Sequence, residues 1–467
     1  MKRKIKVLYV TAEIAPYANS GGMAEVARSF PKALMATGDY EVRRVMPLYK
    51  NMDVRVKYKM DFPVPMEYGY DTCVLKTASD KNELPTYFIG NERYYYRENI
   101  YGYEDDNVRF FFFCKAVIEM LKRINYTPDI IHTNDWHTGF LPLLIKKEFP
   151  NIKSVYTIHN IAYHGYIPST YLNDLLTDRE KVLLGYPEWL DFAKAGILYS
   201  DLLTTVSPAY AKEIMSSSYG DGMSKLIESR KNEMIGILNG IDDEIYNPMR
   251  VGEVPFPYDN NSLSEKKKNR EVLRKNYGLS NEDIPLVAMI TRLDFSKGIE
   301  LLIKTIADYG IPNYQLVLLG SGNCYYQGLL ANIASEYPGT FTVDFEYTEE
   351  KAKLIYAGAD IYLMPSQNEP CGLGQLYAMK YGTVPVVHPV GGLKDTVLVE
   401  KEHPEKSTGF YMSEWNSEAL KEALQQAIST YKTKDWDQYR QNCMQYDSSW
   451  KSGLAEYQKY YQMLLEN

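Results

Sequence analysis

The chain has little cysteine and no hydrophobic run long enough to cross a membrane, which takes about 20 apolar residues. A disulfide framework and a zinc site are not expected, because the cysteines are odd in number and none lies close to another. The amino-terminal apolar stretch is short and is interrupted by Lys6, so we expect no signal peptide and a reducing, cytoplasmic location. The five cysteines are Cys73, Cys114, Cys324, Cys371 and Cys443.

The chain also lacks an excess of positive charge. It has 52 lysines and arginines against 60 aspartates and glutamates, a net charge of −8. Nucleic-acid binding needs a basic footprint, and the longest basic run, 266–268, is interpreted as a solvated helix face. We therefore expect no nucleic-acid or membrane partner. The 42 tyrosines suit a carbohydrate partner, because aromatic faces stack on sugar rings, but tyrosine used as core filler explains the count as well.

Short apolar runs predict an α/β fold with parallel sheets. Each run is rich in β-forming residues, ends on polar residues and is separated from the next by a helical pattern. The polar ends matter because open parallel sheets bind ligands beyond the carboxyl ends of their strands. The runs are 5–11, 130–133, 154–158 and 202–206 in the first half, and 285–291, 315–319, 361–364 and 384–387 in the second.

The two series of strands predict two domains. One hydrophobic core rarely grows beyond about 250–300 residues, and this chain has 467. A glycine- and asparagine-containing connector separates the series, so a hinge is expected near 237–250. Ligands of such paired domains usually occupy the cleft between them. The last segment, Trp450 to Leu465, has a helical pattern whose packing partner the residues alone do not indicate.

Two cations flank a predicted strand-to-helix turn in the second half. Arg292 follows a strand, and Lys297 precedes a helix, where free N–H groups favour an anion such as a diphosphate. A surface arginine and lysine beside a turn is the competing interpretation. Two glycine turns also join strands to helices, at Gly320-Ser321-Gly322 and at Asn19-Ser20-Gly21-Gly22, and neither has a complete dinucleotide or Walker pattern.

A carboxylate stands beside a glycine loop at Glu369-Pro370-Cys371-Gly372-Leu373. It could bind sugar hydroxyls and stabilise positive charge at a sugar carbon, or it could cap a helix that begins near Leu373. His159 and Asn160 end another strand, where they could face a ligand or be satisfied by backbone groups.

Other polar residues are assigned no ligand. The spacing of His132, Asp135 and His137 does not place both histidines on one helix face, so we expect no metal there. Asp435 and Asp437 form the only Asp-x-Asp pattern, but they lie in a charged helical stretch and are interpreted as surface residues.

Taken in order, these motifs resemble bacterial glycogen synthases and plant starch synthases, which extend α-1,4-glucan from a nucleotide-glucose with retention of configuration. The resemblance runs nearly end to end and is carried by segments 20–26, 101–110, 132–137, 156–160, 205–208, 236–242, 292–297, 320–322, 356–360, 364–385 and 391–393.

The resemblance implies a GT-B fold, with two Rossmann-like domains facing an interdomain cleft. It implies an acceptor-side domain at 1–240, a nucleotide-sugar-binding domain at 241–449, and a final helix at 450–467 that packs back on the first domain. The implied partners are a nucleotide-glucose donor, ADP-glucose above all, and an α-1,4-glucan acceptor. No metal and no cofactor is implied.

The resemblance also assigns roles to residues. Arg292 and Lys297 would bind the diphosphate, Glu369 would act on the transferring glucose, and His159 and Asp135 would contact the sugar. The implied substrate-binding residues are Asn19, Ser20, Gly21, Gly22, Tyr101, Asn160, Asn239, Gly320, Ser321, Gly322, Cys371, Gly372 and Leu373.

The sequence departs from the family pattern at several positions. Asn19 replaces the usual lysine of the amino-terminal loop, Gly374 a threonine and Tyr246 a tryptophan. A weakened, glucan-binding or regulatory paralogue is therefore an alternative, as is an enzyme with another donor or a small acceptor. Tyr377 argues against the small acceptor, because such enzymes usually carry a second glutamate there.

Overall fold

The first apolar run forms the middle of a nine-stranded sheet. The computed structural model describes residues 3–78, 84–185, 188–400 and 403–466, and it divides into two compact units, 1–240 with 450–467, and 241–449. In unit 1 the strand order is β11-β10-β7-β6-β1-β2-β5-β4-β3. The strands are β1 Ile5–Val10, β2 Tyr40–Pro47, β3 Lys57–Met66, β4 Gly69–Ala78, β5 Thr86–Gly90, β6 Ile130–Asn134, β7 Lys153–Ile158, β10 Leu202–Thr205 and β11 Met234–Gly236.

The central strands of unit 1 are parallel, as the sequence predicts. β1 pairs in parallel with β2 on one side and β6 on the other, and β6, β7, β10 and β11 continue in parallel. These strands are almost wholly buried, which explains their continuous apolar runs. The antiparallel hairpin of β3 and β4 at the sheet's edge was not predicted. A separate two-stranded antiparallel sheet pairs β8 Tyr166–Pro168 with β9 Trp189–Asp191.

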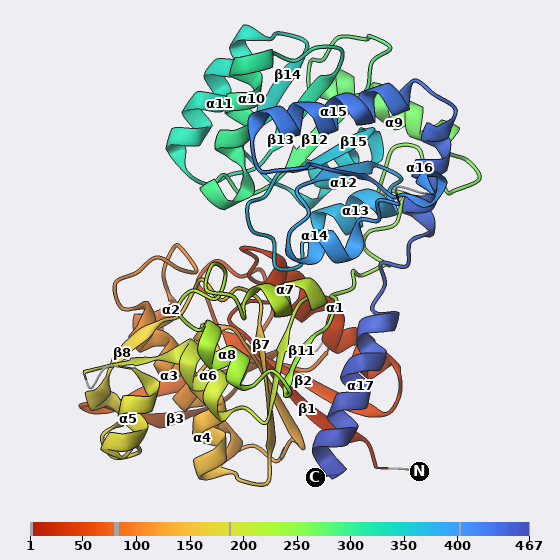
Figure 1. The fold of residues 1–467 in the computed structure, drawn as a ribbon. Coiled ribbons are helices and arrows are strands. Elements are labelled where there is room, and N and C mark those ends of the chain that lie inside the picture. The colour runs from red at the N-terminus through yellow and green to blue at the C-terminus, as the bar shows by residue number, and fades with distance from the viewer. Residues whose placement is uncertain (1–2, 79–83, 186–187, 401–402, 467) are drawn as a thin grey trace. The chain divides into compact units, whose positions relative to one another are not determined.

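Helices connect the strands of unit 1 (Figure 1). The final helix, α17, contacts α1 in the same unit. Trp450, just before α17, donates its indole N–H to Ser29 Oγ at 2.8 Å, and Tyr457 and Tyr461 of α17 are buried. The helices are α1 Gly22–Ala36, α2 Glu92–Tyr95, α3 Asp106–Leu121, α4 Leu141–Glu148, α5 Asp178–Leu184, α6 Phe192–Tyr199, α7 Pro208–Glu213, α8 Ser224–Ser229 and α17 Lys451–Glu466, with 3-10 turns at Trp136–Thr138 and Ser169–Leu172.

Unit 2 contains a six-stranded parallel sheet in the order β14-β13-β12-β15-β16-β17. Its strands are β12 Leu286–Ile290, β13 Gln315–Leu319, β14 Phe341–Asp344, β15 Ile361–Met364, β16 Val384–Val387 and β17 Phe410–Tyr411. Its helices are α9 Ser264–Asn276, α10 Ile299–Tyr309, α11 Cys324–Glu336, α12 Glu349–Gly358, α13 Gly374–Lys380, α14 Gly391–Thr396, α15 Ser417–Tyr431 and α16 Asp435–Gln445, with 3-10 turns at Phe295–Lys297 and Pro404–Lys406.

The basic run in α9 corrects one prediction. Lys266 is only 2% exposed, and its ammonium group donates to the carbonyls of Tyr356 and Ala357 and to Thr383 Oγ1, at 2.7–3.1 Å. The two carbonyls lie in the last turn of α12, where carbonyl groups have no partner within the helix and favour a cation. Interpreting 266–268 as a solvated face was therefore wrong for Lys266, although the two residues that follow it are exposed.

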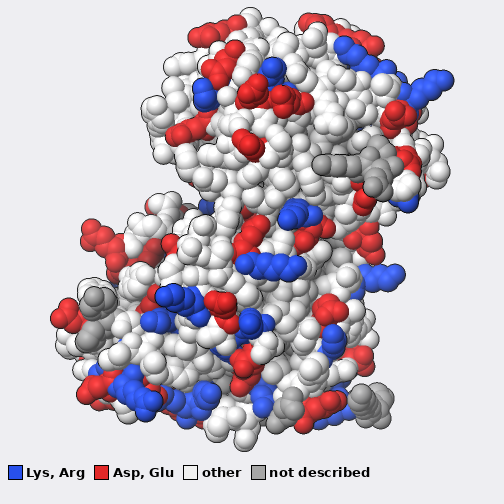
Figure 2. Space-filling view, viewed as in Figure 1, with Lys and Arg blue, Asp and Glu red and all other residues white. Residues whose placement is uncertain are grey.

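Charge is mixed on the face drawn in Figure 2, where basic and acidic side chains are interspersed. No helix among the described residues is both long and apolar enough to span a bilayer.

Candidate active site

The candidate residues of unit 1 lie where the strand order reverses. The chain passes from β1 to β2 on one side and later returns to β6 on the other, and such switch points open a crevice at the carboxyl ends of the strands. Asp135 directly follows β6, and His159 follows the neighbouring β7. Asp135 Oδ1 accepts the backbone N–H groups of His159 at 2.6 Å and of Asn160 at 3.2 Å. The structure thus brings these three residues together.

Asp135 combines backbone strain with an unusual charge environment. Its φ of 53° lies in the left-handed region, which costs free energy in a residue other than glycine and persists at functional sites. Burial raises the pKa of Asp135 to about 7, with a smaller contribution from the negative charge of Glu13, while the two backbone N–H groups oppose the rise. At neutral pH the carboxyl group is therefore divided between its protonated and charged forms.

The histidines near Asp135 are neutral at physiological pH. Burial lowers the pKa of His159 to about 3, and its Nε2 lies 2.9 Å from Asn134 Oδ1, which also accepts the hydroxyl of Tyr9. With both bonds on the amide oxygen, Nε2 of His159 is the donor. Asn134 therefore fixes the orientation of the His159 ring.

Hydroxyl groups hold His132, and aromatic rings pack against His137. His132 is 1% exposed, with its ring nitrogens bonded to the hydroxyls of Tyr461 and Thr157 at 2.5 and 2.6 Å. His137 stacks on Trp136 and packs against Tyr101 with its ring tilted. Among the described residues no group of three metal-ligating side chains is found. His132 is thus a core residue that anchors the carboxyl-terminal helix.

The glycine turn of unit 1 leads from β1 into α1. Ser20 donates both its backbone N–H and its hydroxyl to the buried carboxylate of Glu13, and Tyr101 donates its hydroxyl to the same carboxylate at 2.6 Å. Asn19 donates to Glu25 at 2.9 Å. Gly21 and Gly22 are exposed. Asn239 follows the edge strand β11, and its buried Oδ1 has no hydrogen-bond partner among the described residues.

In unit 2 the strand order reverses between β12 and β15, and the candidate residues follow these two strands. Lys297 lies in the 3-10 turn after β12, and Glu369 in the loop after β15. Their side chains form an ion pair of 2.7 Å, only 16% and 10% exposed, and Ser366 donates to the same carboxylate oxygen at 3.0 Å. Arg292 is 53% exposed and lies 3.7 Å from Asp294.

Glycines allow the loops of unit 2 to approach one another closely. A Cβ on Gly320 would lie 1.8 Å from the Thr291 carbonyl oxygen, and one on Gly391 would lie 2.2 Å from that of Glu369. Gly372 has φ 70° and Gly391 has φ 47°, which disfavour other residues. The loops that contain Arg292, Gly320-Ser321-Gly322 and Glu369 all follow parallel strands, so they leave the sheet at the carboxyl ends of its strands.

Glu369 does not cap α13. That helix begins at Gly374, after Leu373, and the position before it makes no side-chain capping bond. Cys371 is buried. A Cβ on Gly374 would lie 2.5 Å from the hydroxyl of Tyr362, so a threonine at Gly374 does not fit beside that tyrosine.

Sequence reasoning missed three residues that shape these loops. Glu13, Asn134 and Ser366 each lie at or just beyond the carboxyl end of a buried strand. The rule that selected Asp135 and His159 could have found them, because each is a polar residue at that edge.

Comparison with known proteins adds to this geometry. The model of the starch synthase catalytic domain matches residues 6–229, and that of glycosyl transferases group 1 matches residues 269–446. A glycogen synthase of Moorella thermoacetica is 38% identical over 100% of this chain and 98% of its own length. One from Geobacillus stearothermophilus is 36% identical over 99% and 98%.

Solved structures are also similar to this chain. The catalytic domain of starch synthase IV from Arabidopsis thaliana, bound to ADP and acarbose, superposes with a TM-score of 0.93 at 28% identity over the whole of both chains. A sucrose-phosphate synthase of Thermosynechococcus elongatus, at 19% identity and a TM-score of 0.68 over 99% of this chain and 100% of its own, shares the fold. The fold is therefore GT-B, and the chain belongs to the glycogen and starch synthase family of glycosyltransferases.

Proposed function

We propose that the chain transfers glucose from ADP-glucose to the non-reducing end of an α-1,4-glucan, with retention of configuration. The observation that carries the proposal is the buried pair of Lys297 and Glu369 beside the glycine loops of unit 2. A glucosyltransferase must meet negative charge on the departing diphosphate and positive charge on the sugar. This pair supplies a cation and a carboxylate, each fixed before the reaction starts.

Lys297 and Arg292 are proposed to bind the diphosphate. Arg292 is exposed enough to reach a ligand, and Lys297 can exchange its contact with Glu369 for one with phosphate. Glu369, held by Ser366, is proposed to stabilise the positive charge that develops on the glucose. Backbone groups of Gly320, Ser321, Gly322, Cys371, Gly372 and Leu373 are proposed to hold phosphate or sugar hydroxyls.

Unit 1 is proposed to bind the sugar and the glucan. His159, neutral at physiological pH, and Asp135 supply hydrogen-bonding groups at the carboxyl edge of the sheet. Tyr101 and the 19–22 turn lie at the same edge, together with Asn160, and Asn239 is proposed to complete this set. Neither the diphosphate contacts nor the sugar contacts need a metal in this scheme.

The departure at Asn19 favours a second candidate, a glucan-binding or regulatory paralogue with weakened transfer. The neutral amide of Asn19 donates to Glu25, which also pairs with Arg28 at 2.6 Å. The turn thus presents an amide where the family usually has a lysine, so attraction for a diphosphate is reduced.

Glucose transfer tests the proposal directly. The protein is incubated with glycogen and either ADP-glucose or UDP-glucose, and released nucleotide and glucan length are measured. We expect transfer from ADP-glucose that is lost in Glu369→Gln and kept in the matched control Glu346→Gln, whose side chain is 92% exposed. Tight glycogen binding without transfer would favour the paralogue, and single additions to a short acceptor would favour a small-acceptor enzyme.

A further inference from the structure

One buried carboxylate joins two loops of the candidate site in unit 1. Glu13 is 3% exposed. Its Oε2 accepts the backbone N–H of Ser20, and its Oε1 accepts the hydroxyls of Ser20 at 2.8 Å and Tyr101 at 2.6 Å. The glycine turn after β1 and the loop that precedes α3 are therefore tied to a single side chain.

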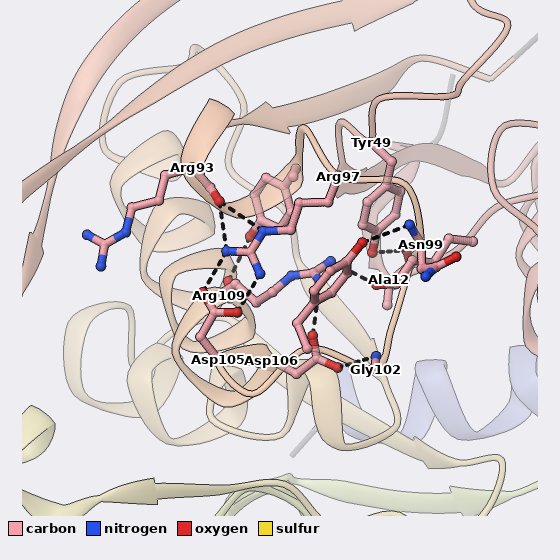
Figure 3. A network of polar contacts seen from close by, with 12 residues as sticks. Ala12, Tyr49, Arg93, Arg97, Asn99, Gly102, Asp105, Asp106 and Arg109 are labelled. Atoms are coloured by element: carbon pink, nitrogen blue, oxygen red, sulfur yellow. Dashed lines mark hydrogen bonds and ion pairs between the residues drawn. The ribbon is translucent and has the colours of Figure 1, made fainter.

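Hydrogen bonds from α3 hold the loop on either side of Tyr101, and Figure 3 shows the one between Gly102 and Asp106. The guanidinium group of Arg109 is fully buried and contacts Asp106 Oδ1 at 2.9 Å and the Ile100 carbonyl at 2.8 Å. Asp106 also accepts the N–H of Gly102 at 2.8 Å. Residues on both sides of Tyr101 are thus held from α3, so Tyr101 offers Glu13 a fixed donor.

The glycine turn, in contrast, has little packing to hold it. Residues 19–22 are exposed, and a Cβ on Gly21 would meet no atom within 4 Å. Hydrogen bonds must therefore define its conformation. Ser20 makes two of them with Glu13, and because that acceptor is a buried carboxylate they are stronger than bonds between neutral groups.

We propose that Glu13 is a positioning residue that holds the 19–22 turn in its substrate-binding conformation by linking it to Tyr101. The inference rests on the proposed function in assigning the turn to nucleotide-glucose. Without the link the turn would occupy other conformations, and the substrate would bind only the competent fraction. The apparent affinity falls by that fraction, while turnover of the bound complex is retained.

Steady-state kinetics separate positioning from loss of folded protein. In Glu13→Ala we expect the KM for ADP-glucose to rise roughly tenfold with kcat within about twofold of the parent. Ser20→Ala, at an exposed position, should raise KM in the same direction without endangering the fold. Glu13→Gln should be milder, because the hydroxyls of Ser20 and Tyr101 can reverse and accept from the amide. A smaller folded fraction would instead lower kcat and leave KM unchanged.

A double-mutant cycle tests the link itself. If Tyr101 and Glu13 act through one contact, Tyr101→Phe should add less to KM in Glu13→Ala than in the parent. Tyr126→Phe is the matched control, because its buried hydroxyl bonds to the Val7 carbonyl, within β1 rather than beyond its carboxyl end, and it should leave KM unchanged. Fully additive effects would overturn the proposal.

Hydrogen exchange provides a readout that does not depend on activity. The Ser20 amide donates to Glu13, so its exchange should accelerate roughly tenfold or more in Glu13→Ala and not in Tyr126→Phe. Unchanged exchange together with unchanged KM would overturn the inference. If the parent transfers no glucose, the proposed function fails, and the exchange result alone decides whether Glu13 holds the turn.

Discussion

Three histidines whose pKa is lowered by burial should make unit 1 sensitive to mild acid. His132 and His137 are 1% and 7% exposed, and burial lowers the pKa of each to about 3. In the unfolded chain a histidine takes up a proton near pH 6.5. The contribution of these histidines to the free energy of unfolding is therefore fully present above pH 6.5. It is lost as the pH falls from 6.5 towards 3, because only the unfolded state binds the protons in that window.

The size of the effect follows from the two pKa values. At pH 5.5 each of these histidines, and His159 with its equally low pKa, disfavours the folded state by about 1.4 kcal/mol relative to pH 7.5, and the three together by about 4 kcal/mol. Asp135 acts in the opposite direction. Its folded pKa of about 7 lies above the unfolded value of about 3.9, so the folded state takes up its proton first and gains about 2 kcal/mol over the same interval.

Variants separate these contributions. Urea unfolding is measured at pH 7.5 and pH 5.5, with hydrogen exchange of peptides from β6 and β7 reporting on unit 1. His132→Gln should reduce the loss between the two pH values by about 1.4 kcal/mol, and Asp135→Asn should increase it by about 2 kcal/mol. His403→Gln, exposed and in unit 2, should change nothing. The reasoning is refuted if His132→Gln and the parent lose the same stability.

Three further substitutions test the loops and the ion pair. Gly320→Ala should destabilise unit 2 by roughly 2 kcal/mol in denaturant unfolding, since its Cβ would overlap a backbone carbonyl, whereas Gly328→Ala, in the open on helix α11, should be neutral or stabilising. Lys297→Met should cost about 3 kcal/mol by leaving the carboxylate of Glu369 buried without its cation, and adding Glu369→Gln should restore most of that loss. Asn19→Lys should lower the KM for ADP-glucose roughly tenfold, and an unchanged KM would mean that this position does not meet the diphosphate.

The parallel core was predictable because its strands are buried on both faces. Continuous apolar runs such as those of β1 and β7 indicate strands that are buried on both faces, and this inference does not depend on the rest of the fold. The edge hairpin of β3 and β4 escaped notice because one of its faces is exposed, so its apolar residues alternate with polar ones and with Pro63 and Pro65. The position of this hairpin depends on the pairing of β4 with β5, which no local sequence pattern predicts.

Site residues were predictable where they directly follow a parallel strand. Asp135 and His159 follow adjacent parallel strands, which brings them together in any such sheet. The contact between Glu13 and Tyr101 was not predictable, because the two residues are far apart in sequence and the Tyr101 loop is held in place by Arg109 of α3. The burial of Lys266 was not predicted for the same reason, since the carbonyls that accept from it lie on another helix.

The central claim is that this chain builds α-1,4-glucan from a nucleotide-glucose. The most direct measurement is glucan chain length after incubation with glycogen and ADP-glucose, for the parent, Glu369→Gln and Glu346→Gln. The account predicts stepwise chain extension by the parent and by Glu346→Gln, and none by Glu369→Gln. It is contradicted if the parent releases no ADP and extends no chain with either ADP-glucose or UDP-glucose, or if Glu369→Gln extends glucan as fast as the parent.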